Sequence, residues 1–125
     1  MEGVETLSLT ECFGLLAGRS LARVAYTERA LPAAWPVHYV LVDRRLVLRD
    51  DHDGLHARLD GQIVAVQIDD ADADGKYSWV VVVTGTARLL GEPAEPGRQR
   101  EVTAVEITPG DVRGHRVRRT PATAA

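Results

Sequence analysis

The chain has 125 residues, a formal net charge of −3 and 26% charged residues. A chain of this length suits a single domain that buries roughly two-thirds of its unfolded surface, so we expect one domain over residues 1–125. Because the charge is mixed and mildly acidic, with no basic stripe that could follow a phosphate backbone, nucleic acid is not an expected partner.

The first predicted element is a short amphipathic helix. Ser8 followed three residues later by Glu11 forms a capping box, and apolar residues recur at helical spacing from Leu9 until Gly18 stops the pattern. Cys12 lies on the apolar stripe, which predicts a buried structural thiol rather than a reactive one. A single cysteine excludes an internal disulfide framework. With no signal peptide and no apolar run of about 20 residues, the sequence predicts a cytoplasmic protein without a membrane partner.

Short strands follow this helix. Alternating polarity and β-branched residues predict strands at residues 21–26, 37–42, 46–49, 63–68, 79–83, 86–90 and 102–107. Residues 54–59 read as a brief helix, residues 43–45 as a tight turn, and residues 69–75 as an acidic turn with calcium binding as the alternative. The sequence therefore predicts a mainly β protein, a small barrel of about six antiparallel strands with one N-terminal helix and a short helix after the third strand.

Two segments differ from the alternating strands, namely residues 79–83 and 118–125. Residues 79–83 are apolar at every position, so both faces of that strand should be covered, one of them by a second subunit. The C-terminal residues 118–125 combine Arg, Thr, Pro and Ala, which predicts a flexible tail.

In their order and spacing, these segments resemble the pyridoxamine 5′-phosphate oxidase-like family of FMN-binding split β-barrels, particularly its short actinobacterial members. The resemblance rests on SLTECFGLLAG, a Pro-Val-x-Tyr strand that starts at Pro36, LVLRD with DGLHARL, IVAVQIDD, VVVTGTA and the closing VEITPGDVRGHRV. It implies a homodimer that acts on a small-molecule substrate.

The resemblance also implies an FMN site in a cleft between the two subunits. The isoalloxazine would lie along the strand of Pro36 and Val37, and cations would hold the phosphate. The strand-end cation maps to Arg49, and the next helix contributes His56, where the family usually has lysine. Arg58 and Trp79 complete the expected cofactor-binding set, with core packing as the alternative role for Trp79.

Three acids depart from the family pattern. Asp50 replaces the hydroxyl residue that commonly follows the strand-end cation, and Asp51 and Asp53 lie close to it in sequence. An FMN phosphate carries nearly two negative charges, and each like-charge contact at about 4 Å would cost on the order of 4 kcal/mol at an effective dielectric near 20. Residues 91–101 are also too short for the helical insert that usually closes the cleft. An altered phosphate site in a more open pocket is therefore expected.

The same segment allows other interpretations. His52 and His56 are four residues apart and could ligate a metal from one helical face, but Gly54 interrupts the register, so no metal site is predicted. The interpretation that we favour is a solvated turn in which Asp53 caps the short helix. Contact of Asp51 or Asp53 with a ligand is the third possibility.

His38 is the candidate catalytic residue. Imidazole titrates near neutral pH and the resemblance places His38 in the cleft, although a hydrogen-bonded core histidine is the alternative. Three functions remain open: an oxidoreductase that uses FMN or a deazaflavin, a flavin-independent enzyme that uses His38 with the Asp/His segment as acid and base, and a small-molecule binding or sequestering protein.

Overall fold

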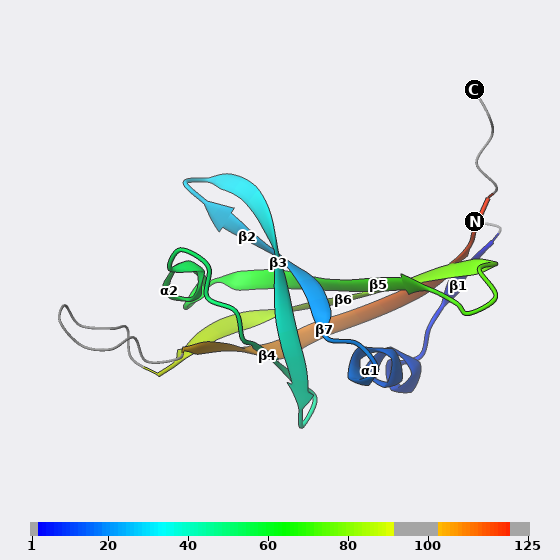
Figure 1. The fold of residues 1–125 in the computed structure, drawn as a ribbon, viewed down its shortest axis with the longest axis horizontal. Helices are drawn as coiled ribbons and strands as arrows, with labels where there is room; N and C mark the ends of the chain where they lie inside the picture. The colour runs from blue at the N-terminus through cyan, green and yellow to red at the C-terminus, as the bar shows by residue number, and fades with distance from the viewer. Residues whose placement is uncertain (1–2, 92–102, 121–125) are drawn as a thin grey trace.

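The computed structural model describes residues 3–91 and 103–120, and the ribbon in Figure 1 shows a mainly β protein. Its elements, in chain order, are β1 Val4–Thr6, α1 Leu9–Ala17, β2 Leu21–Glu28, β3 Leu31–Val42, β4 Arg45–Leu48, α2 Leu55–Leu59, β5 Ile63–Ala71, β6 Tyr77–Leu90 and β7 Ala104–Arg118. Within the described ranges, neither helix has the length and apolar character needed to cross a membrane.

Six of the strands close into a barrel. The sheet order is β1-β7-β4-β3-β2-β5-β6, and a further pairing of β6 with β7 joins the two ends of the six-stranded part. Every pairing is antiparallel, and β1 is added to the outside of this ring along β7. The structure confirms the predicted fold class, including the N-terminal helix and the short helix after β4. Strand β1 was not predicted.

The β2–β3 hairpin is longer than the sequence indicates. Its strands pair from Leu21 with His38 to Glu28 with Leu31, whereas the predicted strands end at residue 26 and begin at residue 37. The turn residues Arg29 and Ala30 both have positive φ, at 51° and 64°, which is the conformation of a type I′ turn. Because neither is Gly or Asn, and because two prolines follow, this segment lacks the usual sequence signals of a hairpin.

Other predicted boundaries change as well, and the last strand, predicted at residues 102–107, is β7 and runs on to Arg118. The turn between β3 and β4 contains only Asp43 and Arg44, because Arg45 already pairs with Val42. The two strands predicted at residues 79–83 and 86–90 form the single strand β6, which passes a bulge at Gly85. A Cβ atom at Gly85 would overlap the backbone carbonyl of Thr108, so the close approach of β6 and β7 requires glycine here.

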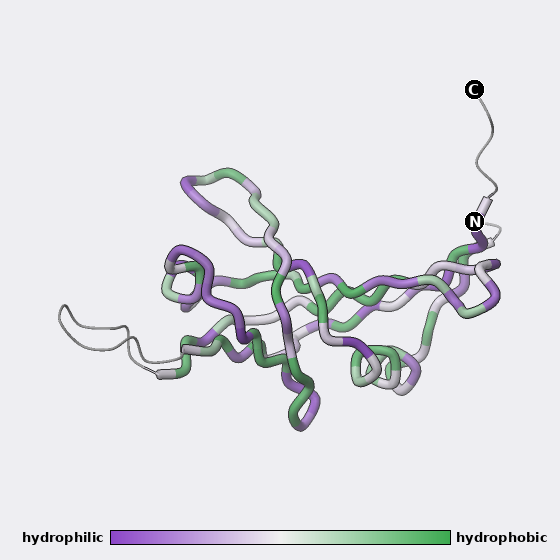
Figure 2. The backbone as a smooth tube through the Cα atoms, viewed as in Figure 1, coloured by the Kyte–Doolittle hydropathy of each residue, from purple (hydrophilic) through white to green (hydrophobic). Residues whose placement is uncertain are grey.

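The core fills the barrel with side chains from alternate strand positions. Figure 2 shows the hydrophobic residues gathered along the strands and the hydrophilic ones at the turns. The fully buried residues with the largest side chains include Tyr39, Leu46, Leu48, Ile68 and Ile107. On β6, Val81 and Val83 are fully buried, while Val80 and Val82 on the opposite face are only half-buried in the single chain.

Helix α1 packs against the barrel through its apolar stripe. Ser8 and Glu11 form the predicted capping box, in which each backbone N–H donates to the other side chain at 3.1 Å. Cys12 is 1% exposed, which confirms the predicted buried thiol, and burial raises its pKa. Gly114 of β7 lies directly against the Cys12 sulfur.

The acidic segment after β5 differs from the predicted turn. Asp69 and Asp70 belong to β5 and pair with Val80 and Trp79. Asp70 also bonds the Arg19 side chain at 2.7 Å, so part of the segment anchors the start of β2. At the C-terminus, Arg118 is still part of β7 and pairs with Tyr77 of β6. Residues 121–125 of the predicted tail, and residues 92–101 of the short connection, lie outside the described residues.

Candidate functional site

The outer face of β3 and β4 carries the first group of predicted site residues. Pro36 and His38 are exposed on this face, next to Val40, which is 38% exposed. Arg49 follows the last paired residue of β4, and its backbone N–H donates to the His38 carbonyl at 2.9 Å. Because the β3–β4 ladder continues in this register, His38 and Arg49 lie side by side on the outer face.

Asp50 binds His38 rather than standing free beside Arg49. Its Oδ2 accepts hydrogen bonds from the His38 backbone N–H at 3.2 Å and lies 2.5 Å from His38 Nδ1. The hydrogen bond from the His38 side chain is the main reason that the pKa of Asp50 is lowered. The His38 side chain is 59% exposed, so it is not the core histidine of the alternative interpretation, and its Nε2 is left for exchange with a ligand or solvent.

Asp51 holds the start of α2 instead of Asp53. Asp51 Oδ1 accepts from the His56 backbone N–H at 3.1 Å, and Oδ2 accepts from the Thr103 hydroxyl at 3.3 Å. The N-cap position itself is Gly54, with φ at 74° and no side-chain cap, so the predicted capping role of Asp53 is wrong. Asp53 has a positive φ of 51°, which turns the chain just before the helix.

His56 lies inside the protein. It is fully buried, its Nδ1 lies 2.8 Å from the Thr103 hydroxyl, and its Nε2 has no hydrogen-bond partner in the described part of the chain. Burial lowers the pKa of His56 and outweighs the nearby Asp51 carboxylate, which acts in the opposite direction. The structure therefore does not bring the His56 ring to the surface beside Arg49.

Arg58 points toward the β2–β3 hairpin. Its Nη1 donates to the Asp53 carbonyl at 2.8 Å and its Nε lies 3.6 Å from Glu28. Between α2 and the hairpin is a pocket of about 260 Å³, whose walls include the half-exposed Trp35 and the His52 ring, 5.9 Å apart. Trp35 was not among the predicted site residues, although a tryptophan directly before the Pro-Val-x-Tyr strand was a usable signal.

Val37 and Trp79 are core residues in the single chain, at 1% and 3% exposure. A ligand on the outer face could meet Val37 only through its backbone. Trp79 lies ten residues along β6 from Leu89, and Leu89 and Leu48 pair with the same residue of β7, Val105. This places Trp79 roughly 30 Å along the strand from Arg49, the residue after Leu48. Trp79 is therefore not brought together with Arg49. In the described part of the chain, no three His, Cys, Asp or Glu side chains converge as a metal site.

These features define a class of protein: a six-stranded split β-barrel with a basic residue at the end of a strand on the outer face. Residues 8–125 match the family described as pyridoxamine 5′-phosphate oxidase. The uncharacterized protein Rv0080 of Mycobacterium tuberculosis is 33% identical over 91% of this chain and 86% of its own length. The chain therefore belongs to the pyridoxamine 5′-phosphate oxidase family.

Solved structures share the whole fold. The FAD binding protein from Mycobacterium smegmatis is 27% identical and aligns with a TM-score of 0.74 over 92% of this chain and 99% of its own. A FAD-binding protein from Mesorhizobium loti is 22% identical and aligns with a TM-score of 0.72 over 93% and 98% of the two chains. The described elements of this protein thus account for nearly all of each related structure.

Proposed function

We propose that the protein is a flavin-binding oxidoreductase that acts on a small organic molecule at the outer face of β3 and β4. The flavin would supply hydride transfer, Arg49 would hold its phosphate, and Pro36 and the Val37 backbone would line the ring. Family membership and the FAD-binding protein from M. smegmatis support a flavin of either kind, FMN or FAD. His56 and Trp79 are too deeply buried in the single chain to serve without rearrangement.

The observation that carries this proposal is the direction of the acids near Arg49. Asp50 accepts hydrogen bonds from the backbone and ring of His38, and Asp51 accepts them from the His56 backbone and the Thr103 hydroxyl. The partial positive charges of these N–H and O–H donors offset part of the repulsion that the two carboxylates would exert on a phosphate. Arg49 remains exposed at the end of the strand.

A flavin titration with a charge-removing variant tests this role. We expect FMN and FAD to bind with shifted absorption bands, and Arg49→Gln to weaken both by about tenfold or more, because a hydrogen bond to a charged group contributes about 1.5–3 kcal/mol. Riboflavin, which has no phosphate, should be unaffected by the substitution. Arg88→Gln is the matched control, since Arg88 is exposed on β6 and pairs with Glu106.

Two results would contradict the proposal. Absence of binding by all three flavins at high micromolar concentration would remove the cofactor, and equal weakening of riboflavin by Arg49→Gln would remove the phosphate contact.

Completion of the site by a second copy of the chain is part of the same proposal. Val80 and Val82 form a half-buried apolar stretch on the outer face of β6, and the neighbouring Ala65 of β5 is also half-buried. Sedimentation analysis should show a dimer, and Val82→Lys should shift it toward monomer and weaken flavin binding together, because a charged side chain is poorly tolerated in the core of an interface.

A flavin-independent enzyme is the second candidate, and the His38–Asp50 pair favours it. A carboxylate that fixes one nitrogen of an exposed imidazole leaves the other nitrogen oriented for proton exchange. His38 Nε2 would hold or deliver a proton in either function. With the flavin of the loaded protein chemically reduced and a quinone as acceptor, or with any substrate found without flavin, His38→Gln should slow the reaction about 100-fold. Unchanged turnover would remove His38 from the catalytic machinery.

A further inference from the structure

A second pocket lies at the end of the barrel where α1 packs. Of the residues that line it, Trp79 alone was among the predicted site residues. The volume of the pocket is about 230 Å³. We propose that this pocket binds a small amine with a compact apolar body. The proposal is independent of the flavin, because it rests on the composition of this pocket.

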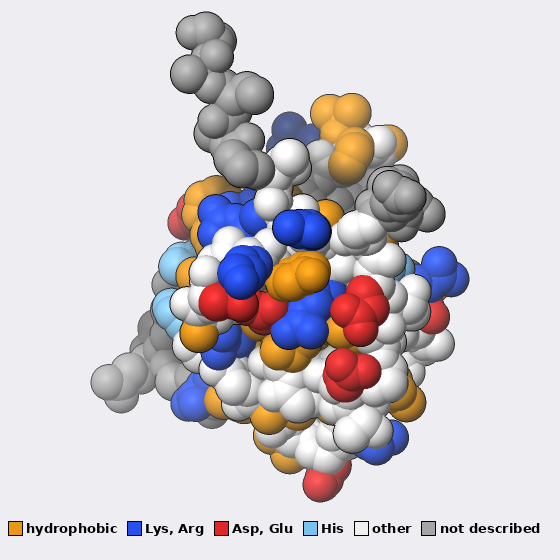
Figure 3. All heavy atoms as spheres, turned by 90° about the vertical axis from the view of Figure 1, so that its right-hand side faces the viewer, with side chains coloured by type: hydrophobic (Ala, Val, Ile, Leu, Met, Phe, Trp, Pro, Cys, Tyr) orange, Lys and Arg blue, Asp and Glu red, His pale blue; other side chains and the backbone are white. Residues whose placement is uncertain are grey.

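The walls of the pocket are mainly apolar. Trp79 is 3% exposed and Leu7 is 8% exposed, and Leu15 of α1 is partly buried against the core. The Arg19 guanidinium lies over the Trp79 ring at 5.4 Å from its centroid, which helps to fix the indole. Figure 3 shows this end of the molecule, where hydrophobic side chains are surrounded by basic and acidic ones. Such a lining suits a ligand with an apolar body and few polar groups.

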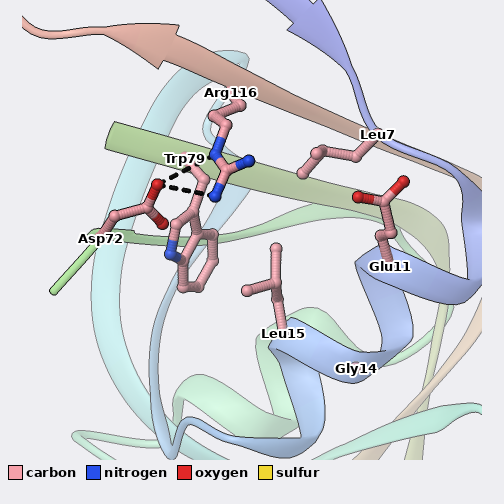
Figure 4. A pocket seen from close by; sticks show the side chains of 7 residues that line it. All are labelled: Leu7, Glu11, Gly14, Leu15, Asp72, Trp79 and Arg116. Atoms are coloured by element: carbon pink, nitrogen blue, oxygen red, sulfur yellow. Dashed lines mark hydrogen bonds and ion pairs between the residues drawn. The ribbon is translucent and has the colours of Figure 1, made fainter. Parts of the chain in front are cut away.

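Arg116 is already neutralised on one side of the pocket. Its Nε and Nη2 lie 2.9 and 2.7 Å from the same carboxylate oxygen of Asp72, and its guanidinium also lies over the Tyr77 ring. Figure 4 shows the third guanidinium nitrogen directed away from Asp72 and into the pocket. Arg116 can therefore donate to an acceptor on a ligand, but its charge is balanced by Asp72.

Glu11 supplies the excess charge on the opposite side. Its Oε1 accepts the Ser8 backbone N–H of the capping box, and this hydrogen bond is the main cause of its lowered pKa, so the carboxylate is ionised at neutral pH. With Asp72 and Arg116 as a neutral pair, the lining has a formal charge of −1. This balance favours a cationic group over a carboxylate. Figure 4 shows the Glu11 carboxylate beside Leu7, with Arg116, Asp72 and Trp79 on the other side of the pocket.

Gly14 marks a position at which the pocket can be blocked. It lies inside the nine-residue helix α1, where glycine is less favourable than alanine, and it lines the pocket. No atom lies within 4 Å of the position that a Cβ would take at Gly14, whereas a Cβ at Gly85 or Gly114 would collide with its neighbours. Packing therefore does not require glycine here. Gly14 is itself exposed, so this open space is the solvent-facing mouth of the pocket, and a side chain added there can block it.

The test is a titration of isotope-labelled protein followed by the two tryptophan indole signals. Phenethylamine should shift the Trp79 signal and leave Trp35, at the other site, unchanged. The uncharged 2-phenylethanol should bind more weakly, and phenylacetate least. With so few contacts, the dissociation constant for phenethylamine should be on the order of 1 mM.

Two variants separate the pocket from the stability of the fold. Glu11→Gln keeps the capping box, because Gln also serves at this position, and should weaken phenethylamine about threefold without changing 2-phenylethanol. Gly14→Leu should abolish the Trp79 shift while the thermal midpoint stays equal or rises. No response of Trp79 at about 20 mM amine, equal binding of phenylacetate, or unchanged binding by a folded Gly14→Leu protein would each overturn the proposal.

Discussion

The contact between Gly114 and Cys12 gives a sharp test of how α1 is attached to the barrel. A Cβ at Gly114 would overlap Cys12 Sγ and lie 3.2 Å from both Cβ and Cδ1 of Leu7. The backbone cannot retreat easily, because the Gly114 carbonyl accepts the Leu7 N–H at 2.9 Å. Gly114→Ala should therefore destabilise the protein by about 3 kcal/mol, the upper end of the usual range for overpacking.

The double-mutant cycle assigns this cost to the sulfur. Cys12→Ala alone removes one buried atom and should cost about 1 kcal/mol. In the double variant, the new methyl group occupies the space that the sulfur leaves, so the total should be smaller than the sum of the single effects by about 1–2 kcal/mol. The Leu7 contacts remain, so we do not expect full recovery.

Equilibrium unfolding in urea measures all four proteins, provided that the slope of the transition is unchanged. Gly110→Ala is the matched control on β7, since its nearest neighbour, the Thr84 carbonyl, would lie 3.6 Å from the new Cβ. A cost for Gly114→Ala below about 0.5 kcal/mol, or single effects that add within that margin, would refute the packing of α1 described here.

Further predictions concern His56 and Gly85. Burial lowers the pKa of His56 in the folded protein, so as the pH falls the imidazole is protonated in the unfolded chain before it is protonated in the folded one. The stability that neutral His56 contributes is therefore complete above pH 6.5, the ordinary pKa of histidine, and is lost as the pH falls toward the folded pKa. The free energy of unfolding should change by no more than about 1.4 kcal/mol per pH unit in this window. Urea unfolding should show a smaller pH dependence for His56→Asn and an unchanged one for the control His52→Asn, because the His52 side chain is exposed. Gly85→Ala should cost about 3 kcal/mol or prevent folding, because the colliding Thr108 atoms belong to the backbone.

The sequence predicted those features that depend on local patterns. The capping box of α1 and the alternation in the strands are set by residues a few positions apart, and the order of the motifs supplied the barrel topology. The extension of the β2–β3 hairpin did not follow, because Arg29 and Ala30 adopt positive φ without Gly or Asn. Pro32 also disfavours a strand by its type, yet it pairs with Thr27.

The candidate site was harder to predict than the fold, because it depends on the direction of side chains. Asp51 is five residues before His56 and bonds its backbone, while its other oxygen meets Thr103, which is 52 residues away in sequence. No local pattern contains that contact. For the same reason, the sequence could indicate His56 as a cation for a phosphate but could not show that α2 turns its ring into the core.

The structure explains why Asp50, whose negative charge disfavours a bound phosphate, stands directly after Arg49. The paired part of β4 ends at Leu48, opposite Tyr39, so the His38 N–H lies beyond the last regular pair. Asp50 satisfies this N–H, and Arg49 donates to the His38 carbonyl, so the two residues complete the ladder where the strand stops. An acid at this position is thus explained by the end of a β-ladder, and the same contact fixes the His38 ring on the outer face. Asp50→Asn separates these roles, since an amide can replace the backbone contact but removes the charge beside both His38 and Arg49.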